Sequence, residues 1–67
     1  MENQIRQYIN DVFYDLEQAC AESGESLCAE GLADAVGDHM YDVSAEYRAM
    51  PYDQRRAMTI RITQQYV

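Results

Sequence analysis

Residues 29–50 read AEGLADAVGDHMYDVSAEYRAM, and their apolar side chains recur every three or four positions. The members of this stripe are Ala29, Leu32, Ala33, Val36, Met40, Val43, Tyr47 and Met50. Such spacing is typical of one face of an amphipathic α-helix. Because the stripe keeps its phase throughout, we predict one long helix from about Leu27 to Ala49. The alternative is that Ser44 caps a separate short helix.

A second helix is predicted from Glu2 to about Glu22, upstream of this stretch. Its apolar residues also recur at spacings of three and four, and they are Ile5, Ile9, Val12, Phe13, Leu16, Ala19 and Cys20. Ser23 and Gly24 end the helix, because glycine readily adopts the left-handed conformation of a helix C-cap. Ser26 is then the expected N-cap of the long helix.

The third segment runs from Pro51 to about Tyr66 and opens as helices do, with proline in the first turn and Asp53 close behind. Residues 58–63, MTIRIT, instead alternate with period two and are rich in β-branched side chains, which is typical of a strand. A lone strand needs a partner strand from another chain. We therefore favour a helix.

These segments predict an all-α fold, a small three-helix bundle with an antiparallel N-terminal helical hairpin. A chain of 67 residues has room for a single domain, which we assign to residues 1–67. No apolar run approaches the length of a membrane-spanning helix, and the start does not resemble a signal peptide. We expect a cytoplasmic protein, monomeric or homodimeric, without membrane association.

Charge is distributed very unevenly along the chain. The chain has twelve acidic residues, five arginines and no lysine, which gives a net charge of −7. Between Gln7 and Tyr47 there is no lysine or arginine, while the same stretch holds ten carboxylates. A protein that binds nucleic acid directly normally carries a basic patch, so this balance argues against direct nucleic-acid binding.

Within this stretch, the acidic residues are spaced to form rows on helices. Glu30, Asp34, Asp38, Asp42 and Glu46 follow one another at four-residue intervals, and Asp11, Asp15 and Glu22 share one side of the first helix. Like charges at this spacing repel one another and destabilise a helix by a few tenths of a kcal/mol per pair. We predict a continuous anionic ridge that a cationic protein binds, with Tyr8, Tyr14 and Tyr41 as flat anchors beside it. The alternative is a solvated face that only keeps the protein soluble.

Other chemistry finds little support in the sequence. No catalytic motif, cofactor motif or metal-ligand pattern occurs, so we expect neither an enzyme nor a cofactor or metal site. Cys20 and Cys28 flank the predicted turn. We expect reduced thiols, with Cys20 packed in the core because it shares the phase of the core stripe. A disulfide between the two cysteines is the alternative. His39 is expected at the edge of the core. The C-terminal arginines Arg55, Arg56 and Arg61 are expected to pair with the acidic hairpin. The alternatives are that they form a second contact surface or face the acidic hairpin of another copy in a dimer.

In size, charge and expected architecture, the whole chain resembles small acidic phage-encoded proteins that mimic DNA, and is most similar to anti-CRISPR proteins against type I Cascade. The resemblance implies a non-enzymatic inhibitor that occupies the cationic DNA-receiving surface of a CRISPR surveillance complex in the bacterial host cytoplasm. No signature residue carries it, so the candidate partner-binding residues come from charge and position alone. They are Asp11, Asp15, Glu22, Glu30, Asp34, Asp38, Asp42, Glu46, Tyr14 and Tyr41.

Two other hypotheses remain open. One is a helical protein-interaction or antitoxin-like adaptor module that binds through its C-terminal apolar segment. The other is a redox-responsive regulator that uses Cys20 and Cys28.

Overall fold

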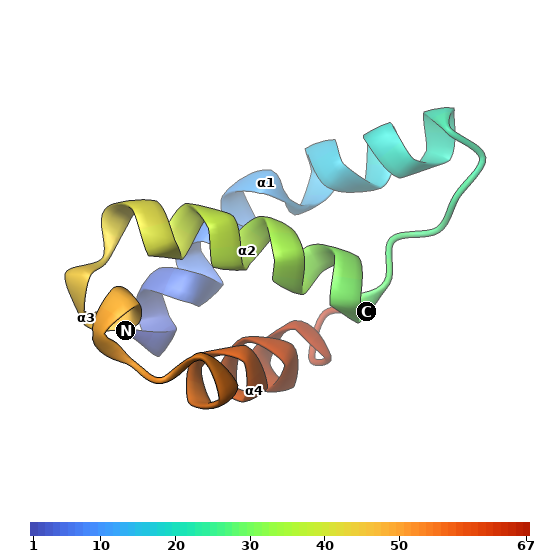
Figure 1. Cartoon of the computed structure of the whole chain (residues 1–67). Coiled ribbons are helices and arrows are strands. Elements are labelled where there is room, and N and C mark those ends of the chain that lie inside the picture. Colours follow the sequence, from blue (N-terminus) through green and yellow to red (C-terminus); the bar gives the residue numbers. More distant parts are fainter.

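The computed structural model covers residues 1–67 and contains four helices and no strand (Figure 1). The helices are α1 (Glu2–Glu22), α2 (Ala29–Val43), α3 (Ala45–Ala49) and α4 (Tyr52–Thr63). The expected all-α class is confirmed, and residues 58–63 belong to α4 rather than to a strand. The β-branched residues of this segment are accommodated in the helix because Thr59, Ile62 and Thr63 are buried against its neighbours.

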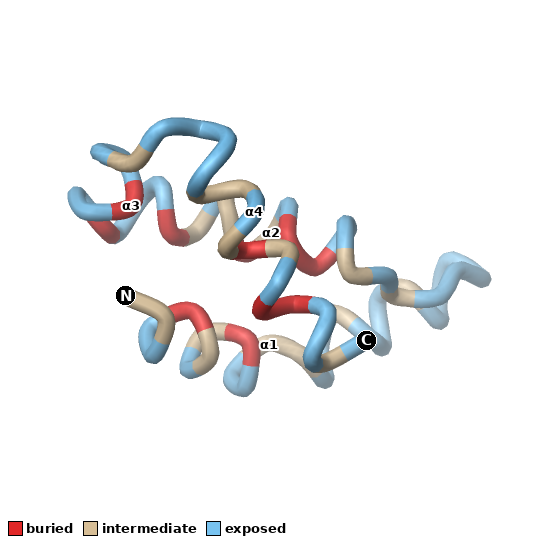
Figure 2. The backbone as a smooth tube through the Cα atoms, turned by 90° about the horizontal axis from the view of Figure 1, so that it is seen from below, coloured by how far each residue is buried: buried red, intermediate tan, exposed pale blue.

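Helix α1 has the bounds that the sequence predicts. Ser23 follows its last residue, and Gly24 adopts a φ of +75°, the left-handed conformation that favours glycine. Only Ile5 and Ile9 of α1 are fully buried, and both lie in its first half. The second half diverges from α2 and ends in the loop that leads back to it (Figure 1). No residue of this half is coloured as buried in Figure 2.

Helix α2 begins two residues later than expected. Cys28, not Ser26, is its N-cap, and the Cys28 thiol accepts a hydrogen bond from the backbone N–H of Gly31 at 3.3 Å. The Ser26 prediction is therefore wrong. Sequence alone favoured serine because its oxygen is the stronger acceptor, yet Cys28 is the residue that stands three positions before an unpaired helix N–H.

The prediction of one helix from Leu27 to Ala49 is also wrong, because the chain breaks at Ser44. Ser44 adopts an extended conformation, and its hydroxyl accepts a hydrogen bond from the backbone N–H of Tyr47 at 3.1 Å, which caps α3. Arg48 closes the other side of the break by donating to the carbonyl oxygens of Tyr41 and Asp42 at 2.7 and 3.1 Å. The alternative of a separate short helix capped by Ser44 is the observed one.

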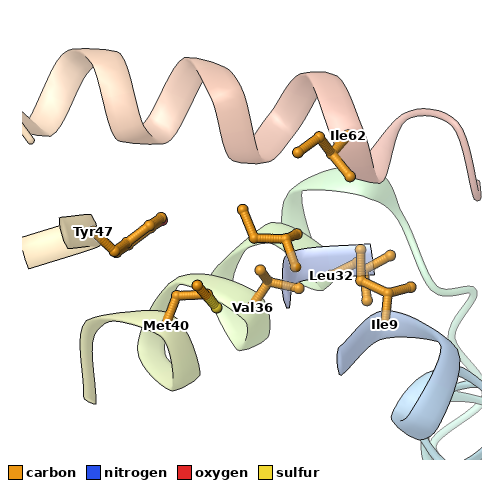
Figure 3. Close-up of a cluster of buried hydrophobic side chains, with 7 residues drawn as sticks. Ile9, Leu32, Val36, Met40, Tyr47 and Ile62 are labelled. Carbon is orange, nitrogen blue, oxygen red and sulfur yellow. The ribbon is translucent and has the colours of Figure 1, made fainter. Parts of the chain in front are cut away.

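The hydrophobic core lies where the four helices meet (Figure 3). It consists of Ile5, Ile9, Leu32, Val36, Met40, Tyr47 and Ile62, each at most 3% exposed. The break after Val43 lets Tyr47 leave the axis of α2 and reach α4, where its hydroxyl lies 2.7 Å from the hydroxyl oxygen of Thr59. Thr63, further along α4, donates to the carbonyl oxygen of Ala29 at 3.2 Å. Helix α4 therefore runs back along α2 and covers one side of it.

Candidate acidic interaction surface

Four carboxylates follow the solvent side of α2, and we call them the α2 acidic row. Its members are Glu30, Asp34, Asp38 and Asp42, and all four are exposed. The buried residues Leu32, Val36 and Met40 occupy the opposite side of the same helix. The row spans ~18 Å along the helix axis. Because four residues exceed a full turn by ~40°, the row winds around α2 rather than following a straight line.

Glu46, the fifth expected member, does not continue this row. It lies on α3, after the break at Ser44, and is exposed there. A single straight rod from Glu30 to Glu46 is therefore excluded by the fold, since the helix axis changes direction between Asp42 and Glu46.

On α1, the three predicted acids are exposed but are not equivalent. Asp11 lies in the half of α1 that packs against α2, and its Oδ1 accepts a hydrogen bond from Nε2 of Gln7 at 3.3 Å. Glu22 is the last residue of α1, at the end that diverges from α2 (Figure 1). Asp15 lies between them and makes no ion pair. The structure brings Asp11 close to α2 and leaves Glu22 far from the α2 acidic row.

Few of these carboxylates are neutralised by the chain's own arginines. Glu2 pairs with Arg6 and Arg61 at 3.8 and 3.2 Å, and Asp34 pairs with Arg56 at 2.7 Å. The hydrogen bond from Arg56 to Asp34, together with the negative charge of that carboxylate, raises the pKa of the Arg56 guanidinium further above its ordinary value. The other ten of the 12 carboxylates form no ion pair.

Two of the three C-terminal arginines form the expected internal ion pairs. Arg56 reaches the α2 acidic row and Arg61 reaches the start of α1, as internal ion pairs. Arg55 pairs with no carboxylate. Its guanidinium lies 5.2–6.0 Å from the ring centroids of Tyr41, Tyr47 and Tyr52, and it donates to the carbonyl oxygen of Met50 at 2.9 Å. These tyrosines hold the cation by cation–π attraction.

Two of the three predicted anchor tyrosines are exposed. Tyr14 is 70% exposed on the outer half of α1, and Tyr41 is 50% exposed beside Arg55. Tyr8 instead packs in parallel against His39 of α2, with ring centroids 3.8 Å apart and an angle of 7° between the ring planes. Sequence reasoning missed this contact. The signal that could have found it is that Tyr8 and His39 both flank the core stripes of their helices.

Two cavities of similar size open on the surface. The first, about 430 Å³, lies between α2 and α4 beside Arg55, Arg56 and Tyr41. The second, about 450 Å³, lies between α1 and α2 beside Tyr8, Asp11 and His39. We call the second one the α1/α2 groove. Neither was predicted from the sequence, because each depends on how the helices pack.

The two cysteines are free thiols in this structure, Cys20 half-buried and Cys28 exposed at the start of α2. No group of three or more potential metal ligands comes together. None of the four helices is both long enough and apolar enough to cross a bilayer.

Comparison of the chain with known protein families, curated proteins and solved structures found no match in any of the three.

Proposed function

We propose that this chain is a non-enzymatic inhibitor whose acidic helical surface mimics DNA and blocks the nucleic-acid-binding site of a host defence complex, in the manner of anti-CRISPR proteins. The observation that carries the proposal is the α2 acidic row, which is exposed along its length and has one ion pair among its four carboxylates. Such a row lowers helix stability by like-charge repulsion, and a cationic partner relieves that repulsion on binding.

The density of charge supports the same function. Nine unpaired carboxylates between Gln7 and Tyr47 are distributed over a molecule whose longest dimension is 36 Å. That corresponds to one charge per about 4 Å, compared with ~3.4 Å per phosphate along one strand of duplex DNA. A channel lined with lysine and arginine for one DNA strand therefore meets a similar charge spacing here.

In this proposal, α1 and α2 act together as an antiparallel hairpin. Asp11 and Asp15 extend the acidic surface beyond the α2 acidic row, and Tyr14 and Tyr41 supply exposed aromatic contacts. Glu22 and Glu46 belong to the periphery of the surface, because the fold takes them away from that row. The partner is a cationic nucleic-acid-binding protein in the bacterial cytoplasm, such as a CRISPR surveillance complex.

The alternative adaptor function fits the packing less well. An adaptor that binds through the C-terminal apolar segment needs that segment free, yet Ile62 is fully buried in the core. Thr59 and Thr63 are buried as well. The side of α4 that carries Ile62 is therefore already used inside the chain.

The test is competition with target DNA for a purified type I Cascade complex at several salt concentrations. We expect the protein to displace labelled duplex DNA, and its apparent affinity to fall steeply with added salt, because screening weakens exposed charge pairs. The double variant D38K/D42K removes the unpaired members in the middle and at the end of the α2 acidic row, without touching the pair of Asp34 with Arg56.

The matched control is E17K/E25K, which changes two exposed acids outside that row. Because each reversal adds two positive charges, both double variants have a net charge of −3. Loss of displacement in D38K/D42K but not in E17K/E25K supports the proposal. Equal inhibition by both variants and by the original chain contradicts it.

A further inference from the structure

The two surface cavities differ in charge, although they are nearly equal in volume. The cavity between α2 and α4 is lined by two guanidinium groups, those of Arg55 and Arg56, which stand beside the carboxylates of Asp34 and Asp38. The α1/α2 groove is lined by no arginine, and Asp11 is the only carboxylate residue in its lining. A cationic side chain of a partner therefore has to compete with two arginines for the carboxylates of the first cavity, whereas in the groove it meets Asp11 without a competing arginine.

The groove is rich in hydrogen-bond acceptors. Asp11 forms no ion pair and accepts one hydrogen bond, from Gln7. The side-chain amides of Asn3, Gln4 and Gln7 also line the groove, and each carries a carbonyl oxygen. A guanidinium offers five N–H donors in one plane and no acceptor, so it complements this set.

The remaining walls of the groove suit the flat head and long stem of an arginine. Tyr8 and His39 line it as a parallel pair of rings at 3.8 Å, and a guanidinium stacks on aromatic rings as an ammonium group does not. Val43, which also lines the groove, is 57% exposed although it is apolar. Its side chain offers a contact for the methylene stem.

We infer that the α1/α2 groove is the pocket for one arginine side chain of the partner protein, with Asp11 as its charged acceptor and Tyr8 and His39 as its aromatic wall. This inference rests on the proposed function, since it names one contact of the same acidic surface. The groove selects arginine over lysine, because its aromatic wall stacks on a guanidinium and not on an ammonium group.

The experiment measures the affinity of the full chain for hexa-arginine and hexalysine peptides by calorimetry at low salt, in four single variants. D11N removes the charge in the groove, and D15N removes the same charge one turn along α1, outside it. H39A removes one ring of the stacked pair, and H39F keeps a ring there without its nitrogen atoms. Circular dichroism confirms that each variant is folded.

We expect D11N and H39A to lower the preference for hexa-arginine over hexalysine by about threefold, and D15N and H39F to retain it. In the original chain, hexa-arginine should shift the NMR resonances of the Tyr8 and His39 rings more than hexalysine does. An equal preference in all variants overturns the inference, as do NMR shifts confined to the cavity around Arg55.

Failure here is distinguishable from failure of the proposed function. If D38K/D42K abolishes DNA displacement while D11N leaves the arginine preference intact, the DNA mimic stands and the arginine pocket is refuted. If the arginine preference depends on Asp11 while Cascade still binds its target DNA, the pocket stands and the proposed partner is refuted.

Discussion

The guanidinium of Arg56 donates a hydrogen bond from Nη1 to Oδ1 of Asp34 at 2.7 Å, so a cation from α4 neutralises one carboxylate inside the α2 acidic row. Asp34 is 70% exposed at its side chain and Arg56 is 30% exposed. The pair therefore lies at the surface, where it contributes little to stability but competes with any cation of a partner.

Arg56→Gln should strengthen binding to a cationic partner by about two- to fivefold, because it frees Asp34 and removes a repelling charge. The measurement is the displacement of DNA from Cascade, or hexalysine affinity, at several salt concentrations. The control is Arg61→Gln, which makes the same change in net charge beside Glu2 on α1. If the two variants gain equally, net charge and not the local pair sets the affinity.

The same pair should be insensitive to pH over the range in which the protein is handled. Its hydrogen bond raises the pKa of Arg56, so its contribution is fully present below the ordinary arginine pKa and is lost only as the pH rises through the folded-state value. Thermal unfolding of the original chain and of Arg56→Gln should therefore differ by the same amount at pH 7 and at pH 9. If the difference in thermal stability between the two proteins is smaller at pH 9 than at pH 7, this prediction is wrong.

Tyr47→Phe should lower the free energy of unfolding by about 1 kcal/mol, since it removes a buried hydrogen bond and nothing else. The hydroxyl of Thr59 already donates to the carbonyl oxygen of Arg55 at 2.7 Å, so the Tyr47 hydroxyl is the donor to Thr59. We expect a fall in melting temperature of about 4–8 °C for a chain of this size. Tyr14→Phe, at an exposed ring, should leave it unchanged.

Cys28→Ser should stabilise the protein by a few tenths of a kcal/mol or more, because a hydroxyl is a better N-cap acceptor than a thiol. Cys28→Ala should destabilise it by about 0.5–1 kcal/mol. Urea unfolding measures both. Ser26→Ala is the informative comparison, because it should leave the stability unchanged. A loss of stability in this variant would mean that Ser26, and not Cys28, caps α2.

Ile9→Ala should be severely destabilising, by about 2–5 kcal/mol, because Ile9 is completely buried between helices. Leu16→Ala should cost less, since Leu16 lies in the half of α1 that diverges from α2 and is only half-buried. Urea unfolding of both variants gives the comparison. Equal losses would mean that the outer half of α1 packs as tightly as the inner half.

Features set by neighbours along the chain were predictable from the sequence. The bounds of α1 follow from its apolar stripe and from Gly24, and the α2 acidic row follows from the four-residue spacing of its members. The break at Ser44 was harder to predict, because Tyr47 stays in phase with Val43 although the helix axis turns between them. The buried contact of Tyr47 with Thr59 shows, together with the cap at Ser44, why the turn is favoured.

Features set by packing between helices were not predictable. Asp34 and Arg56 are 22 residues apart, and nothing local to either residue selects the other among the available charges. The stacking of Tyr8 on His39 likewise depends on how α1 meets α2. Both surface cavities arise from such contacts, so the candidate site became a set of distinct subsites only once the helices were placed.

The uneven burial of α1 has a consequence for how the chain opens. Its fully buried side chains stop at Ile9, while the helix continues to Glu22. Leu16 is the last residue of α1 that packs against the core, so the turns after it unwind without exposing the core. Their amide hydrogens should exchange with deuterium well before those of α2. A protease that reaches these turns or the loop at 23–28 would nick the native molecule while its core stays folded.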